Sequence, residues 1–329
     1  MVTVHPLIWV GFVAFVLGML AIDLFLFHRE SHEVTAREGA MWVGIWMSMG
    51  VGFTFVIWAW QGGTAAGEYI AGYLLEYSLS ADNIFVFILI FSYFAVPAAY
   101  QHRVLFWGIL GALVFRAGFI AAGAVLLERF DFMFYVFGAF LVYTGIRMAR
   151  HGEVEIHPEN NPVLSAVRRV FRMTTTYHGQ KFFVRENGRR LATPLFAVLI
   201  VVETTDIVFA VDSIPAIFGV TRNAFLVFTS NAFAILGLRA LYFLLANMMK
   251  RFQYLQLGLS AVLVFIGVKM LVNHWFHVPI WASLGFIIVT LSVAVVVSLR
   301  VKTPPSDLPP APLDVIPGTD LEEPQESSG

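Results

Sequence analysis

The fold is decided by stretches such as residues 194–218, which read PLFAVLIVVETTDIVFAVDSIPAIF. A helix of this length can cross a bilayer, because about 30 Å of hydrocarbon requires roughly 20 mostly apolar residues. The apolar residues form a long run and do not alternate with a period of two, so a membrane β-strand is excluded. Three acids, Glu203, Asp206 and Asp212, interrupt this run. The stretch predicts a transmembrane helix that carries charge within the membrane.

The composition of the whole chain agrees with a membrane protein. Hydrophobic residues make up 58% and charged residues 13% of the 329 residues, and the mean hydropathy is +0.76. Soluble domains carry about 25% charged residues. The formal net charge of -1 provides no basic field for nucleic acid. Cysteine is absent, which excludes disulfides, thiolate metal sites and thiol catalysis.

Working outward from residues 194–218, eight further segments are long and apolar enough to span. The sequence therefore predicts an all-α integral membrane protein with about nine transmembrane helices. The first segment is too long for the apolar region of a signal peptide and shows no obvious cleavage site, so it is expected to be retained. The predicted spans cover residues 7–27, 40–60, 68–94, 103–127, 132–149, 194–218, 224–249, 254–273 and 279–299.

The Lys and Arg residues between the spans predict the orientation. The connection 150–193 is rich in arginine, and placing it in the cytoplasm brings nearly all other loop bases to the same side. The N-terminus is then outside and the C-terminus inside. Around Asn187-Gly188 the connection predicts a small β-hairpin. A regulatory role and a solvated linker with affinity for anionic lipid both remain open for it.

The chain falls into four predicted regions. Residues 1–149 hold the first five spans, and 150–193 form the cytoplasmic connection. Residues 194–302 hold the last four spans. Residues 303–329 are rich in Pro, Asp and Glu and predict a disordered tail.

An internal duplication relates the third to fifth spans (about 68–149) to the sixth to eighth (about 194–273). Three spans are an odd number, so the second copy enters the membrane from the opposite side. This predicts a 3+3 inverted-topology repeat, an architecture that many transporters use. The matched elements are Asp82 with Asp206, Arg116 with Arg239, and Gly138–Met148 with Ser260–Met270.

Ionisable residues inside spans are costly, at roughly 2.5–3.5 kcal/mol each on insertion scales. Six acids face three bases here, and ion pairing alone does not need this excess. A bound cation or protonation would neutralise it; structural pairing is the alternative for each residue. The residues are the acids Asp23, Glu76, Asp82, Glu203, Asp206 and Asp212 and the bases Arg116, Arg239 and Lys269.

The donor types favour a hard cation. Glu76, Ser80 and Asn83 share one face of their helix, as do Glu203 and Asp206. Carboxylate, amide and hydroxyl oxygens suit Mn²⁺, Mg²⁺ or Ca²⁺, and all nine histidines lie in loops or near span ends. The predicted metal donors are Glu76, Asp82, Asn83, Glu203, Asp206 and Asp212.

Other charged residues receive secondary roles. Arg116 and Arg239 are expected to pair with the acids and balance the charge of the site. Pro215 cannot donate a backbone hydrogen bond, so we expect an unwound turn that swings Asp212 inward. Four further residues are candidates along the ion path, although span-end charges also reach solvent by snorkelling: Asp23, Glu68, Ser80 and Lys269.

Two segments carry a family resemblance. Residues 76–86, EYSLSADNIFV, and 202–218, VETTDIVFAVDSIPAIF, resemble the signature segments of the TerC/Alx family, and Asp23–Arg29 resembles the end of its first span. The resemblance covers roughly residues 7–300. It implies a bacterial inner-membrane protein, named for tellurite resistance, with links to manganese homeostasis and distant kinship to LysE-type exporters. It also implies that the acids at 76, 82, 203, 206 and 212 match the family's intramembrane acids.

Taken together, the sequence predicts a secondary transporter that exports divalent cations, with Mn²⁺ favoured, by alternating access and with proton antiport. No catalytic constellation or nucleotide-binding motif is present, so an enzyme is not expected. No permanent cofactor is expected; the partners are the metal ion and lipid, and not nucleic acid. Two alternatives are a membrane scaffold subunit of a metal-stress or tellurite-resistance system, and a pH-responsive, proton-coupled transporter of another solute.

Overall fold

The computed structural model describes most of the membrane region and part of the connection after it. Described are residues 4–27, 36–130, 132–151, 166, 171–174, 176–186, 189–246, 254–272, 275–276 and 278–300. The side chains of Asp23 and Asp82 lie outside the described part, as does the predicted tail, 303–329.

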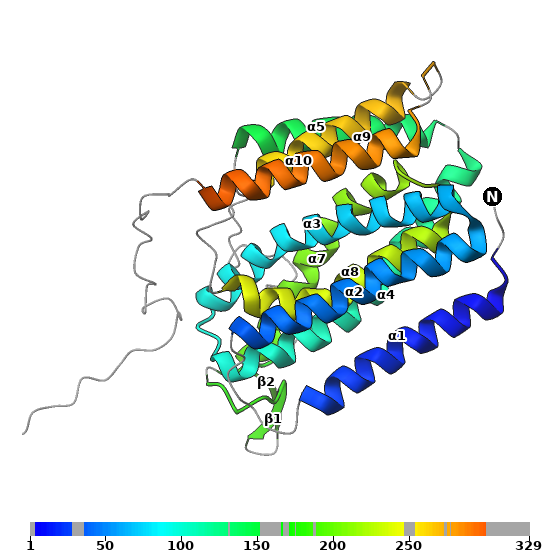
Figure 1. Ribbon diagram of the computed structural model, residues 1–329. Coiled ribbons are helices and arrows are strands. Elements are labelled where there is room, and N and C mark those ends of the chain that lie inside the picture. Colours follow the sequence, from blue (N-terminus) through cyan, green and yellow to red (C-terminus); the bar gives the residue numbers. More distant parts are fainter. Residues whose placement is uncertain are drawn as a thin grey trace, which may run out of the picture.

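Each of the nine predicted apolar segments coincides with a helix (Figure 1). The boundaries differ from the predicted ones by at most five residues. The helices are α1 (Pro6–Phe27), α2 (Ala36–Gln61), α3 (Gly63–Tyr93), α4 (Ala98–Arg129), α5 (Met133–His151), α7 (Pro194–Phe218), α8 (Ala224–Ala246), α9 (Leu255–Val272) and α10 (Ile280–Arg300).

Six of these helices are long and apolar enough to cross a membrane: α2, α4, α7, α8, α9 and α10. The apolar part of α1, Pro6–Ile22, is shorter. α3 has 31 residues but carries Glu68, Glu76 and Asp82, which lower its hydropathy. The chain is therefore an all-α, multi-pass integral membrane protein.

The helices form one bundle in which α8 is central. α8 contacts α2, α3 and α4, and almost all of it is buried. α5 and α9 pack against each other, and α10 covers α9 and α3 (Figure 1). α1 lies at the margin of the bundle, where Phe12 meets Phe225, Phe228 and Phe233 of α8 edge to face. The buried charged residues of α3, α4 and α7 consequently lie within the protein and not against lipid.

The closest helix contact is that of α5 with α9. A Cβ on Gly267 would lie 2.6 Å from the backbone oxygen of Gly138, and a Cβ on Gly145 would lie 2.9 Å from that of Ser260. The earlier residue of α5 meets the later residue of α9, so the two helices run antiparallel. Small residues permit this approach, which is the common basis of helix packing in membranes.

The hairpin predicted around Asn187-Gly188 is confirmed. β1 (Phe183–Glu186) and β2 (Arg189–Ala192) pair antiparallel, with Phe183 opposite Ala192 and Arg185 opposite Arg190. Residues 187 and 188 lie outside the described part. β2 leads directly into α7, which begins at Pro194, so the connection is docked to the bundle at this point.

Candidate functional site

Arg116 of α4 lies at the centre of a buried cluster of charges. Its Nε and Nη2 atoms donate to the two carboxylate oxygens of Asp206 on α7, at 3.1 and 3.0 Å. Its Nη1 atom donates to Oε1 of Glu76 on α3. The planar guanidinium matches the two-oxygen face of a carboxylate, which fixes the geometry of the pair with Asp206.

All three charged side chains are almost completely buried, with exposures of 0% for Glu76, 1% for Arg116 and 3% for Asp206. This triad, Glu76–Arg116–Asp206, carries two formal negative charges and one positive charge. Withdrawing charges from water is costly unless they are paired and hydrogen-bonded. Arg116 pairs with both acids, and one formal negative charge remains in excess on the triad.

Two serines complete the surroundings of the triad. Ser80 donates to Oε1 of Glu76 at 3.4 Å, and Nη1 of Arg116 lies 3.4 Å from the hydroxyl of Ser213. The other carboxylate oxygen of Glu76, Oε2, is buried and has no hydrogen-bond partner among the described residues. An unpartnered buried oxygen is an acceptor for a proton or a cation.

Glu203 lies one turn before Asp206 on α7 and is half-buried. Its carboxylate packs against Gly111 of α4, where any Cβ would collide with it. Its Oε2 atom is buried and likewise lacks a partner in the described part of the chain. A second carboxylate with spare acceptor capacity therefore lies between α4 and α7, close to the triad along α7.

The unwound turn that we expected at Pro215 is not formed. α7 remains helical to Phe218, and the Asp212 carboxylate lies 3.5 Å from the hydroxyl of Thr144 on α5. Pro215 cannot donate to the backbone oxygen of Val211, so one hydrogen bond is missing within α7, but the helix continues through its last turn. Asp212 thus faces α5 and not Arg116.

The predicted metal donors whose side chains the structure describes do not surround a single point. Among the described side chains, no three His, Cys, Asp or Glu residues lie close enough together to hold a metal. Asn83 is buried on α3 about two turns from Glu76, and Arg239 is buried on α8. Asp82, which would have to join such a set, has a side chain outside the described part.

A separate polar group lies where α3 begins. Thr221, in the turn between α7 and α8, donates to Glu68, and the amide of Asn223 donates to Gln61 at 3.2 Å. Lys269 of α9 is half-buried. Glu68 is therefore held in a hydrogen bond that joins α3 to the α7–α8 turn, about two turns along α3 from Glu76.

Sequence reasoning missed Ser213, Gly111 and Thr221. Ser213 could have been found, because it lies seven residues after Asp206 and so on the same helix face. Nothing in the sequence around Gly111 or Thr221 indicates a role in the site, since each contacts a residue that is distant in the chain.

Comparison with known proteins gives a consistent family. Residues 61–305 match the model of the "Integral membrane protein TerC family". The chain is 50% identical over 295 residues to a membrane protein of Myxococcus xanthus named STKORF319, covering 89% of this chain and 92% of the relative. It is 48% identical over 291 residues to the Escherichia coli K12 protein named "Putative membrane-bound redox modulator Alx", covering 86% and 91%.

A more distant membrane protein of Rickettsia bellii is 36% identical over 291 residues, covering 88% of this chain and 96% of the relative. No solved structure matches the chain. The matched region includes all three members of the buried triad. On the family match and on these relatives, the chain belongs to the TerC family of integral membrane proteins.

Proposed function

We propose that the protein is a secondary transporter that exports divalent cations, with Mn²⁺ as the favoured substrate. The observation that carries the proposal is the buried triad with its excess negative charge and the unpartnered oxygens of Glu76 and Glu203. Intramembrane carboxylates with spare acceptor atoms are typical of cation and proton paths. Oxygen donors favour hard cations, among which the family resemblance favours manganese.

The packing of the helices supports the inverted repeat. In the predicted repeat, α3 corresponds to α7, α4 to α8 and α5 to α9. The contact of α3 with α8 therefore corresponds to the contact of α7 with α4, and both contacts are present. In the same repeat, Gly138 corresponds to Ser260 and Gly267 to Gly145. The close approach of Gly138 and Gly267 therefore has a counterpart in the close approach of Ser260 and Gly145. A two-fold relation between the copies would produce both pairs.

The arrangement of the ends supports nine spans. If α1, α3 and α5 also cross, the odd number places the two ends of the membrane region on opposite sides. Figure 1 shows the N-terminus at the end of the bundle opposite the end of α10, and β1 and β2 lie at the same end of the bundle as the end of α10. With the arginine-rich connection inside, the N-terminus is outside and the C-terminus is in the cytoplasm of a bacterium, at its inner membrane.

In this proposal Arg116 acts as a tethered cation. It satisfies Glu76 and Asp206 when the substrate is absent, and an arriving divalent ion takes over part of its contact with the acids. Because the guanidinium stays attached to α4, it rebinds the acids and favours release of the ion. The same carboxylates accept protons after release, which would couple export to proton entry.

The name of the Escherichia coli relative refers to redox modulation. This chain has no cysteine and so cannot perform thiol chemistry itself. We therefore propose cation transport as its primary activity. A scaffold subunit and a proton-coupled transporter of another solute remain the alternatives that the test must separate.

The test is Mn²⁺ flux in proteoliposomes that contain the purified full chain. We expect Asp206→Asn and Glu203→Gln to lower the flux at least tenfold, and Glu128→Gln, an exposed acid near the end of α4, to leave it unchanged. Absence of Mn²⁺, Mg²⁺ and Ca²⁺ flux in the wild-type protein would favour the scaffold. Proton flux that does not depend on metal would favour the transporter of another solute.

A further inference from the structure

The β1–β2 hairpin presents two arginines side by side. Arg185 and Arg190 are directly opposite in the strand register, so their side chains leave the same face of the hairpin, and both are exposed. Among the described residues neither has a carboxylate within ion-pair distance. Like charges that face each other across a strand pair are destabilising. An anion bound between them would remove this cost.

An aromatic cluster adjoins the two arginines. Phe183 lies two residues from Arg185 on the same face, and its ring is 4.7 Å from that of Phe196. Phe171 lies 5.7 Å from Phe196 and 6.1 Å from Phe183. Phe171 and Phe183 are 41% and 45% exposed. Because Phe196 belongs to the first turn of α7, this apolar surface continues directly from a membrane helix.

Hydrogen bonds tie the hairpin segment to the bundle. Thr193 bonds the backbone oxygens of Phe182 and Lys181 at 2.9 and 2.7 Å. Tyr177 donates its hydroxyl to the backbone oxygen of Phe94 at 2.7 Å. Burial raises the pKa of Tyr177 to about 12, so the hydroxyl keeps its proton at neutral pH. The segment is therefore anchored to the turn between α3 and α4.

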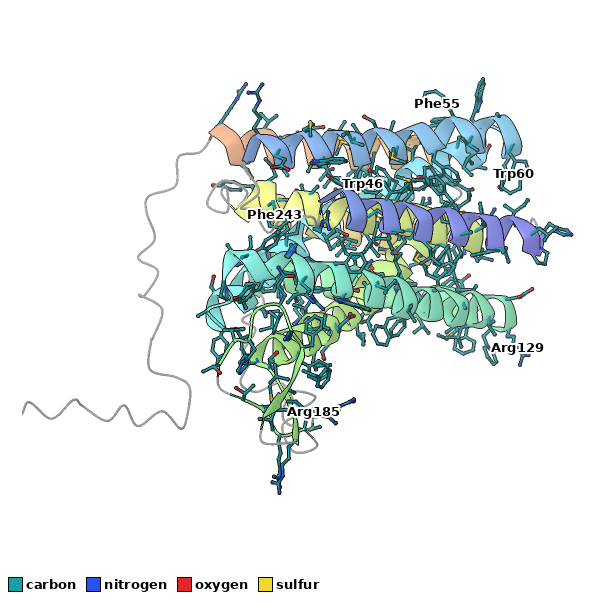
Figure 2. The ribbon with its side chains drawn as sticks, turned by 90° about the horizontal axis from the view of Figure 1, so that it is seen from below. Trp46, Phe55, Trp60, Arg129, Arg185 and Phe243 are labelled. Carbon is teal, nitrogen blue, oxygen red and sulfur yellow. The ribbon has the colours of Figure 1, made fainter. Side chains whose placement is uncertain are left out.

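The position of the hairpin is that expected of a segment at the membrane surface. Both views show β1 and β2 at the side of the helix bundle near one end, and not beyond that end (Figures 1 and 2). Figure 2 shows the side chain of Arg185 directed away from the helices. α7 has 25 residues, about 37 Å at 1.5 Å per residue, and so extends beyond the hydrocarbon core into the headgroup region.

We propose that this face, formed by Arg185, Arg190, Phe171 and Phe183, binds the phosphate headgroups of anionic phospholipids. The paired arginines match the charge of the headgroups, while the phenylalanines enter the edge of the acyl region. If the arginines served only to set the orientation of the protein in the membrane, only their number would matter. Such a role would not require two of them opposite each other beside exposed aromatic rings.

The test measures retention of phosphatidylglycerol by the purified full chain, with native mass spectrometry and phosphatidylcholine as the neutral reference. We expect Arg185→Gln/Arg190→Gln to weaken phosphatidylglycerol binding about 25-fold. This is about fivefold for each arginine, or about 1 kcal/mol each near an anionic surface. Removing the two like charges relieves repulsion within the hairpin, so the variant should fold at least as well as the wild-type protein.

The matched control is Arg189→Gln/Arg300→Gln, which removes two exposed charges, one on the other face of the hairpin and one at the end of α10. It should change binding less than threefold, and Phe183→Ser should weaken binding of both lipids. An equal loss of phosphatidylglycerol binding in the two double variants would mean that only the net charge matters, which would overturn the proposal. Full displacement of the lipid by equimolar inorganic phosphate, or capture of a protein or RNA by the same arginines with no lipid preference, would also overturn it.

Discussion

The contact of α5 with α9 and the contact of α4 with α7 use glycine for different purposes. In the first, Gly138 and Gly267 bring two backbones together, so the atoms in contact have no freedom to move. In the second, Gly111 makes room for the carboxylate of Glu203, and Arg116 reaches across to Asp206. The atoms in contact there are the ends of side chains, which can change partners.

This difference separates a fixed part of the molecule from one that can rearrange. A close-packed backbone contact is lost as a unit or kept as a unit. An ion pair between long side chains can exchange one partner for another while the helices shift. The proposed transport cycle therefore needs α5 and α9 as a pivot and the Glu76–Arg116–Asp206 triad as the element that switches.

The largest effect should come from removing the charge of Arg116, which joins α4 to α7. We expect Arg116→Gln to lower the free energy of unfolding by about 3–5 kcal/mol, because it leaves Glu76 and Asp206 buried without compensation. Thermal unfolding in detergent measures the effect. Adding Asp206→Asn should restore part of the stability. A loss below about 1 kcal/mol would mean that the triad does not hold the helices together.

The next largest effect should come from the α5–α9 contact. Gly267→Ala places a Cβ 2.6 Å from the backbone oxygen of Gly138, so a backbone has to move. We expect a loss of about 1–3 kcal/mol, the usual range for overpacking. Gly285→Ala on α10, where nothing lies within 4 Å, is the control in the same unfolding assay. Equal stability of the two variants would contradict the role of α5 and α9 as a fixed contact.

The smallest effect on stability should come from Gly111→Ala. The three atoms nearest to the added Cβ all belong to the end of the Glu203 side chain, which can turn away. We expect a change in unfolding free energy below about 1 kcal/mol, because the higher helix propensity of alanine offsets part of the clash.

Transport should nevertheless fall severalfold in the Gly111→Ala variant, because Glu203 is displaced from α4. Gly118→Ala, also on α4 but with open space around it, is the matched control. A normal Mn²⁺ flux in Gly111→Ala proteoliposomes would remove Glu203 from the proposed site and leave the triad to be tested alone.

Long apolar runs made the helices predictable, since the bilayer requires about the same length from each of them. The pairing of Arg116 was also predictable, because a buried charge at that depth has few ways to be satisfied. The direction of Asp212 was not. It depends on whether α7 unwinds at Pro215, and the position of that proline in the last turn left the helix intact.

By itself, the sequence determined the membrane class, the positions of the helices, the hairpin at Asn187-Gly188 and the excess of acids over bases in the spans. These follow from local hydropathy, turn chemistry and charge, which act over a few residues. Only the tertiary structure decided that Arg116 takes both Glu76 and Asp206, that Glu203 lies against Gly111, and that Tyr177 ties the hairpin segment to Phe94. Such contacts join residues distant in the chain, and their distances are set by how the helices and strands pack.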